Sequence, residues 1–210
     1  MLTASATFLV VLAPAVNSEG TDTHVINGCP IRPDTLCTEA NLSSADLRRV
    51  DLARANLFES NLRAADLRNA NLAHAKLRGV LLGRANLMDA MLEHADLRAA
   101  ELTRASLHGA NLTDANLQKA NLNGAVFNNV RINRADLSRA SVIGADFTEA
   151  LAMRTNFTGA NLELAVFRGT DLTGANFSNA ILRKADFTGA ILHATSFKGA
   201  DTRGCVGCPK

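Results

Sequence analysis

Three side chains with metal-ligand chemistry recur at a fixed spacing along the sequence. His74, His94 and Asp114 stand twenty residues apart, with Glu93 beside the second histidine. Imidazole nitrogens and carboxylate oxygens are common ligands of zinc and other divalent metals. These side chains would meet only in a fold whose chain returns to the same place every twenty residues. Because five histidines make one such coincidence ordinary, we favour a solvated row of side chains and assign no metal.

Four cysteines form two pairs near the ends of the chain, Cys29 with Cys37 and Cys205 with Cys208. An even number of cysteines is typical of proteins from oxidising compartments. We predict a Cys29–Cys37 disulfide that folds a short cap over the beginning of the domain. For Cys205 and Cys208 we favour a terminal disulfide or a solvated thiol pair. A redox pair, an intermolecular link and half of a metal site stay open.

The first twenty residues have a separate character. Ala6–Val16 is mostly apolar, its end contains Ala13-Pro14-Ala15, which has the A-x-A form, and the first charged residue is Glu19. These features predict a signal peptide within residues 1–20, cleaved near Ala15. We therefore expect export to the periplasm, the extracellular space or the thylakoid lumen, with the cytoplasm as the alternative. No apolar run reaches 18 residues, so we expect no stable membrane insertion.

The elements that must position these residues follow a period of five. An apolar residue recurs at every fifth position from Leu42 to Phe197, large everywhere except Ala152, and 22 of these 32 residues are Leu and seven are Phe. Two positions earlier, Ala stands in 25 of the 32 units. Five is neither the period of a helix nor that of a straight strand.

A bend in every unit explains this period. The large residue and the small residue two before it lie on one side of an extended segment and face a core. The next small residue follows after an odd step, so the chain must turn between them, where Gly, Asn, Asp and Ser are frequent. Repeated turns in one direction wind a solenoid whose coils pair in parallel about 4.8 Å apart. Parallel connections favour a right-handed coil.

The stretches "ANLFESNLRAADLRNANL" and "ADLRAAELTRASLHGANLTDANLQKANL" resemble the pentapeptide-repeat family, whose pattern is A(D/N)LXX. The resemblance implies an all-β fold, a right-handed quadrilateral parallel β-helix with four units per coil. With about 8 coils, the rod would be roughly 38 Å long. We divide the chain into a signal peptide at 1–20, a cysteine-containing cap at 21–39, the β-helix at 40–200 and a Cys-x-x-Cys tail at 201–210.

The phenylalanines are placed to stack within such a coil. With four units per coil, two core columns contain them, one of Phe127, Phe147, Phe167 and Phe187 and an opposite one of Phe157, Phe177 and Phe197. We predict two aromatic ladders inside the rod.

Composition and motifs exclude several classes of function. The sequence contains no phosphate-binding loop, HExxH motif or GxSxG elbow, so we predict no enzyme and no cofactor. Aromatic content is 4%, without Trp or Tyr, which is low for a protein that stacks on nucleic acid. Residues 38–200 carry 19 Lys and Arg against 16 Asp and Glu. This balance gives neither the basic stripe of a nucleic-acid binder nor the acidic strip of a DNA mimic.

The remaining class is a non-catalytic, exported scaffold for an unknown protein partner. Outward apolar residues are denser in the second half of the chain, and Ile143, Leu164 and Ile181 would share a face as an interface. The resemblance also implies a homodimer through the C-terminal end. Two alternatives stay open. One is a DNA mimic that modulates DNA gyrase or a related topoisomerase, as some members of the family do. The other is a metal-binding or redox protein.

Overall fold

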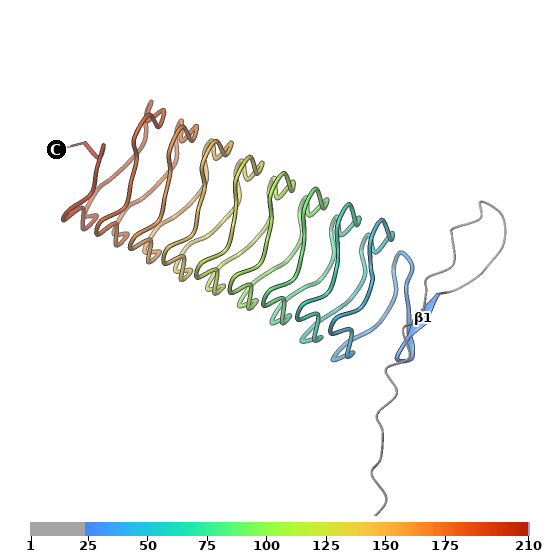
Figure 1. Ribbon diagram of the computed structural model, residues 1–210. Coiled ribbons are helices and arrows are strands. Elements are labelled where there is room, and N and C mark those ends of the chain that lie inside the picture. The colour runs from blue at the N-terminus through green and yellow to red at the C-terminus, as the bar shows by residue number, and fades with distance from the viewer. Residues whose placement is uncertain (1–23, 210) are drawn as a thin grey trace, which may run out of the picture.

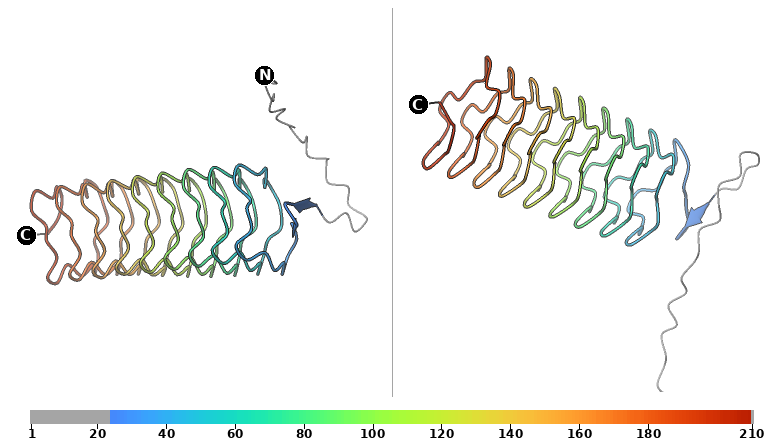
Figure 2. Two further views of the ribbon diagram at one scale, coloured as in Figure 1. Left: turned by 90° about the horizontal axis from the view of Figure 1, so that it is seen from below. Right: turned by 45° about the horizontal axis from the view of Figure 1, so that its top comes forward.

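A computed structural model describes residues 24–209 as a straight rod of stacked coils (Figure 1). The predicted signal peptide lies outside these residues. Residues 24–209 contain no helix. Parallel backbone bridges join each unit to the unit twenty residues later, from Leu36 with Asn56 to Asp186 with Val206. Twenty residues therefore complete one coil, which gives four five-residue units per coil, and Figure 2 shows the coils in register along the rod.

The corner of each unit is a tight turn, illustrated by Leu67–Ala70. The amide of Ala70 donates to the carbonyl of Leu67 at 3.0 Å, and Asn69 before it has a φ of 58°. A positive φ confined to the third residue of such a turn defines type II. Asn, Asp and Gly adopt this conformation at low cost, which explains why they are frequent at the corners.

Where Asp or Asn precedes the large apolar residue, its side chain also stabilises the corner. In the same unit the Asp66 carboxylate accepts the amide of Arg68 at 3.3 Å, and Asn71 accepts the amide of Ala73 at 3.1 Å in the next unit. Asp and Asn side chains are suited to this because they bond their own backbone two residues on. The Asp or Asn of the repeat therefore stabilises the turn that follows it.

The core is a continuous column of Leu, Ala and Phe. Leu67, for example, is fully buried, as is Ala65 before it. The two predicted aromatic ladders are confirmed. In the first, ring centroids of successive phenylalanines lie 4.5–4.9 Å apart, and in the second 4.7–5.2 Å. Rings of the two ladders meet edge to face at 5.5–6.0 Å, an arrangement that aromatic quadrupoles favour.

Hydroxyl side chains replace Ala at a few inward positions, and each is hydrogen bonded. Ser60, Thr155 and Thr170 donate to carbonyl oxygens 23 residues earlier, at 2.6–2.8 Å. Among the described residues no buried side-chain nitrogen or oxygen lacks a partner. The rod therefore accommodates these polar groups without the penalty of an unpaired buried dipole.

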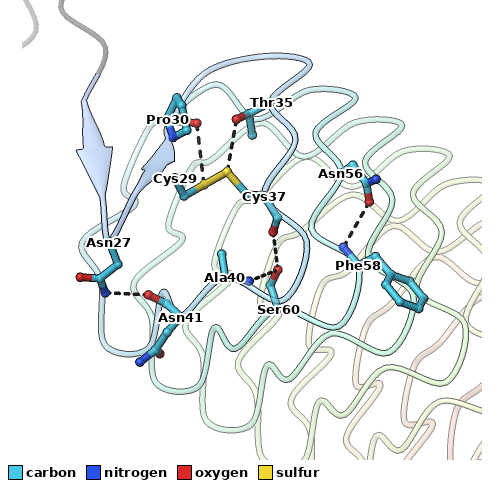
Figure 3. Close-up of a disulfide and its surroundings, with 10 residues drawn as sticks. All are labelled: Asn27, Cys29, Pro30, Thr35, Cys37, Ala40, Asn41, Asn56, Phe58 and Ser60. Atoms are coloured by element: carbon cyan, nitrogen blue, oxygen red, sulfur yellow. Dashed lines mark hydrogen bonds between the residues drawn. A yellow bond between two sulfur atoms is a disulfide. The ribbon is translucent and has the colours of Figure 1, made fainter.

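A short hairpin caps the N-terminal end. Strands β1 (Val25–Ile26) and β2 (Cys29–Pro30) pair antiparallel through an Asn27-Gly28 turn in which both residues have positive φ, 49° and 80°. This is the type I′ turn that suits a two-residue hairpin. The cap contacts the first coil through Asn27, whose side-chain amide donates to the carbonyl of Asn41 at 2.7 Å (Figure 3).

The solenoid reaches beyond the interval 40–200. Cys37 occupies the inward position one unit before Leu42 and is 6% exposed, and the bridges continue to Val206. The two ends differ in coverage, however. Leu192 and Phe197, inward residues of the last coil, are only half-buried, whereas Leu42 in the first coil is fully buried beneath the cap.

Candidate functional site

Because its interior is filled, the described rod can contact another molecule through its outward side chains and its two ends. On the outward faces, Arg side chains pair with Asp two positions earlier in the same unit. Arg68 donates to both oxygens of Asp66 and Arg98 to both oxygens of Asp96. These hydrogen bonds lower the pKa of both carboxyl groups. Local pairing of this kind leaves the rod without a strip of uncompensated negative charge at these units.

The row of His74, His94 and Asp114 exists as predicted, but its contacts differ from those of a metal site. The two imidazole rings stack with centroids 4.8 Å apart, and His94 Nε2 lies 4.0 Å from Asp114 Oδ2. Arg134 donates to both oxygens of Asp114 at 2.5 and 2.8 Å, which lowers the pKa of that carboxyl group. Within residues 24–209 no group of three or more His, Cys, Asp or Glu side chains is arranged to hold a metal ion.

The structure joins both cysteine pairs as disulfides, in two different environments. Cys29, in β2 of the cap, and Cys37 are 2% and 6% exposed and belong to the core, where the Thr35 hydroxyl contacts Cys37 Sγ at 3.3 Å (Figure 3). Cys205 and Cys208 are half-exposed at the other end and close a loop with a sequence separation of three. The redox state of either pair in solution stays a prediction.

Ile143, Leu164 and Ile181 lie on one face of the rod. They belong to the units that begin at Ser141, Asn161 and Ile181, and parallel bridges join Ser141 to Asn161 and Asn161 to Ile181. Leu164 is 52% exposed, while Ile143 and Ile181 are half-buried. Their role as an interface stays a prediction. Beyond them, Arg183 and Arg203 both donate to Asp201, at 2.6 Å and 2.6–2.8 Å.

A second outward column also carries exposed apolar side chains. Leu151 bridges Arg131 and Asp171, and Asp171 bridges Ile191. Leu151 and Ile191 are 41% and 53% exposed, and Met153 beside Leu151 is 36% exposed. A shallow hollow of about 280 Å³ adjoins Met153, lined also by Asn133, Arg134, Arg154 and Thr173. The period of five marks all these positions as outward but does not say how far their neighbours cover them.

The described part of the chain has no helix that is both long and apolar enough to cross a membrane.

The fold defines a parallel β-solenoid with five-residue units and outward faces free for contact. The profile described as "Pentapeptide repeat region" matches residues 100–177, and that described as "Pentapeptide repeats (8 copies)" matches 35–72, 65–104 and 170–206. The chain belongs to the pentapeptide-repeat family, which confirms the predicted resemblance.

Solved structures of the same family resemble this rod. HetL from the cyanobacterium Nostoc sp. strain PCC 7120, involved in regulation of heterocyst differentiation, is 33% identical; the match covers 82% of this chain and 86% of HetL, with a TM-score of 0.45. A trypsin-treated form of QnrB1, a plasmid-mediated fluoroquinolone resistance protein, is 21% identical, with coverage of 79% and 88% and a TM-score of 0.67. A comparison with curated protein sequences finds no significant match.

Proposed function

We propose that this protein is a non-catalytic, exported scaffold, a right-handed β-helical rod that binds a protein partner through its outward faces. One observation supports this most directly: inward positions are filled by buried Leu, Phe and Ala. The side chains that can contact another molecule are therefore those on the outward faces and at the two ends of the described rod. A rigid solenoid loses little conformational entropy on binding, which favours recognition over a large, flat area.

Two features of the faces favour a protein as the partner. Exposed apolar side chains such as Leu151 and Leu164 lie among polar ones, a mixture that is typical of protein interfaces. Positive charges are partly compensated, as where Arg183 and Arg203 share Asp201. A phosphate backbone would instead be bound by a surplus of free cations.

Photo-crosslinking tests this proposal. Benzoylphenylalanine placed at Asn161, on the face of Ile181, is compared with the same label at Asn116, on another face. Each labelled rod is mixed with the contents of the exported compartment, with excess unlabelled rod as competitor. Saturable, competed crosslinking to one protein, followed by binding of that purified protein, supports the scaffold. If labels placed on all four faces and at both ends give no saturable crosslinking, the scaffold proposal is contradicted.

The DNA-mimic alternative is tested with the full chain and DNA gyrase. The resemblance to QnrB1, at 21% identity, supports a common fold. A gyrase supercoiling assay with the full chain decides between the functions. Inhibition of supercoiling, or protection of gyrase from a quinolone, at submicromolar protein would replace the scaffold by the mimic as the favoured function.

Export is the second part of the proposal. It is supported by the apolar stretch Ala6–Val16 and by the paired cysteines. Sequencing the N-terminus of the mature protein and assaying cell fractions test it. A mature protein that begins near Val16 in an exported fraction supports the proposal, and retention of Met1 in a cytoplasmic fraction contradicts it.

A homodimer through the C-terminal end is the third part. Leu192 and Phe197 are half-buried there. Among the described residues, no backbone hydrogen bond pairs the outer edge of their units, which a second copy would cover. Sedimentation equilibrium tests it. The wild-type chain should dimerise, and Leu192→Glu should shift it to monomer, whereas the control Leu164→Glu, on a side face, should leave the dimer intact. A monomeric wild-type chain at 100 μM would contradict this contact.

A further inference from the structure

We propose that the Cys205–Cys208 disulfide is a selectively reducible site, a substrate for dithiol reductants that leaves the Cys29–Cys37 disulfide intact. Its opening would release the covering of the rod's C-terminal end. The inference about the dimer below rests on the proposed C-terminal contact, but the selectivity does not.

Access to sulfur distinguishes the two disulfides. Thiol–disulfide exchange requires an attacking thiolate to reach a sulfur atom in line with the bond that breaks. Cys29, in strand β2 of the hairpin, and Cys37 are 2% and 6% exposed and belong to the core cluster. Cys205 and Cys208 are partly exposed and pack against the edge of the core cluster as partly buried residues. An external thiolate therefore reaches the second pair in the folded rod and the first only after the cap opens.

The chemistry is a two-electron exchange with a dithiol. One thiolate of the reductant attacks a sulfur of the Cys205–Cys208 bond, which breaks as a mixed disulfide forms, and the other cysteine leaves as a thiolate that takes up a proton. The second thiol of the reductant then displaces the remaining cysteine. The rod gains two electrons and two protons and holds two thiols, while the reductant becomes a disulfide.

The loop closed by this disulfide has few backbone attachments to the preceding coil. Backbone hydrogen bonds between coils continue as far as Val206, which donates to Ala185 at 2.9 Å and accepts from Phe187 at 2.8 Å. Among the described residues, none after Val206 makes a backbone hydrogen bond to the preceding coil. Residues 207–209 therefore depend on the disulfide and on packing to stay over the core.

Gly207 shows how closely this loop lies against the previous coil. It stands at the position where other units have their large inward residue, and a Cβ there would lie 2.9 Å from the carbonyl carbon and oxygen of Phe187. The loop thus covers the end of the Phe187 column with backbone and sulfur instead of with a large side chain. Once the disulfide opens, Cys208 can move away and the aromatic column gains exposure.

Timed alkylation of the oxidised full-length chain tests the selectivity. The native protein is incubated with dithiothreitol, quenched with N-ethylmaleimide at intervals, and digested for mass spectrometry of the four cysteines. We expect Cys205 and Cys208 to be labelled at least tenfold faster than Cys29 and Cys37, with the difference lost in guanidinium chloride. Equal rates in the native protein, faster labelling of Cys29, or free Cys205 and Cys208 before reductant would overturn the proposal.

Hydrogen exchange tests the consequence for the end of the rod. Selective reduction should raise exchange in peptides covering residues 196–209 and leave those covering 60–180 unchanged. The variant carrying Cys205→Ser and Cys208→Ser should reproduce the reduced pattern without reductant, and the matched variant Cys29→Ser with Cys37→Ser should not. Unchanged exchange after reduction would overturn the coupling between the disulfide and the end.

Sedimentation of oxidised and reduced chains connects this site to the proposed homodimer. If the C-terminal end is the dimer contact, selective reduction should change the dimer dissociation constant at least threefold. An unchanged constant would overturn that link. If neither form dimerises, the proposed homodimer fails while selective reduction, measured by alkylation, still stands.

Discussion

Two glycines in equivalent turns should respond in opposite ways to the same substitution. Gly144 occupies the third position of its corner with a φ of 63°, and a Cβ built there meets no atom within 4 Å. Gly83 occupies the second position of another corner, without a positive φ, and its Cβ would meet only the Thr103 carbonyl at 3.8 Å, an ordinary contact. Neither change creates a clash, so the backbone conformation alone decides the outcome.

The magnitudes follow from that conformation. At Gly144, alanine pays about 1–2 kcal/mol for the left-handed region and regains about 0.4–1 kcal/mol because the unfolded chain has less freedom. Gly144→Ala should therefore lower the free energy of unfolding by about 1 kcal/mol. Gly83→Ala has no such backbone cost and only reduces the freedom of the unfolded chain. It should therefore raise the free energy of unfolding by about 0.4–1 kcal/mol.

Urea denaturation of both variants, followed by circular dichroism, measures this pair. The midpoints should move to opposite sides of the wild type with unchanged slopes. Ala64 and Ala99 already stand at such corners with φ of 55° and 54°, so Gly144→Ala should still fold. Midpoints that shift in the same direction would refute the assignment of the corner conformation.

Three further predictions concern the core and the surface. Phe167→Ala should cost about 3–5 kcal/mol because it removes a ring stacked on both sides, whereas outward Phe58→Ala should cost under about 1 kcal/mol in the same denaturation assay. Thr155→Val should cost about 1 kcal/mol, since it removes a buried hydrogen bond at nearly constant volume; no change in the denaturation midpoint would contradict that role. Hydrogen bonds from Arg203 lower the pKa of Asp201, so its charged form stabilises the folded state above about pH 4 and that stability is lost as the pH falls. Thermal unfolding should show this loss in the wild type and less of it in Asp201→Asn.

The repeat made the fold predictable from the residues. A period of five with two apolar positions per unit demands a bend in each unit, and a turn recurs in every unit of the described rod. The number of units per coil came from the family resemblance, because inward and outward alternation is the same for three, four or five faces. Columns twenty residues apart then placed the phenylalanine ladders and the row of His74, His94 and Asp114 correctly.

The side-chain contacts within those columns could not be predicted from the sequence. The sequence aligned His94 with Asp114, but the reach of the Arg134 side chain, at 2.5 Å, decided that the carboxylate is paired with a guanidinium. The same limit applied to the interface, because the exposure of Ile143 and Leu151 depends on how far neighbouring side chains in adjacent coils lean over them.

The sequence by itself determined the solenoid, its inward and outward residues and the positions of both cysteine pairs. These follow from local rules, since each unit repeats the same turn and the same burial. Only the tertiary structure decided that the two ends are covered differently, with Cys29 of the hairpin and Cys37 buried and Cys205 and Cys208 partly exposed. The physical reason is that the burial of each end depends on segments outside the repeat. Their packing against the terminal coil does not follow from the local pattern of the repeat.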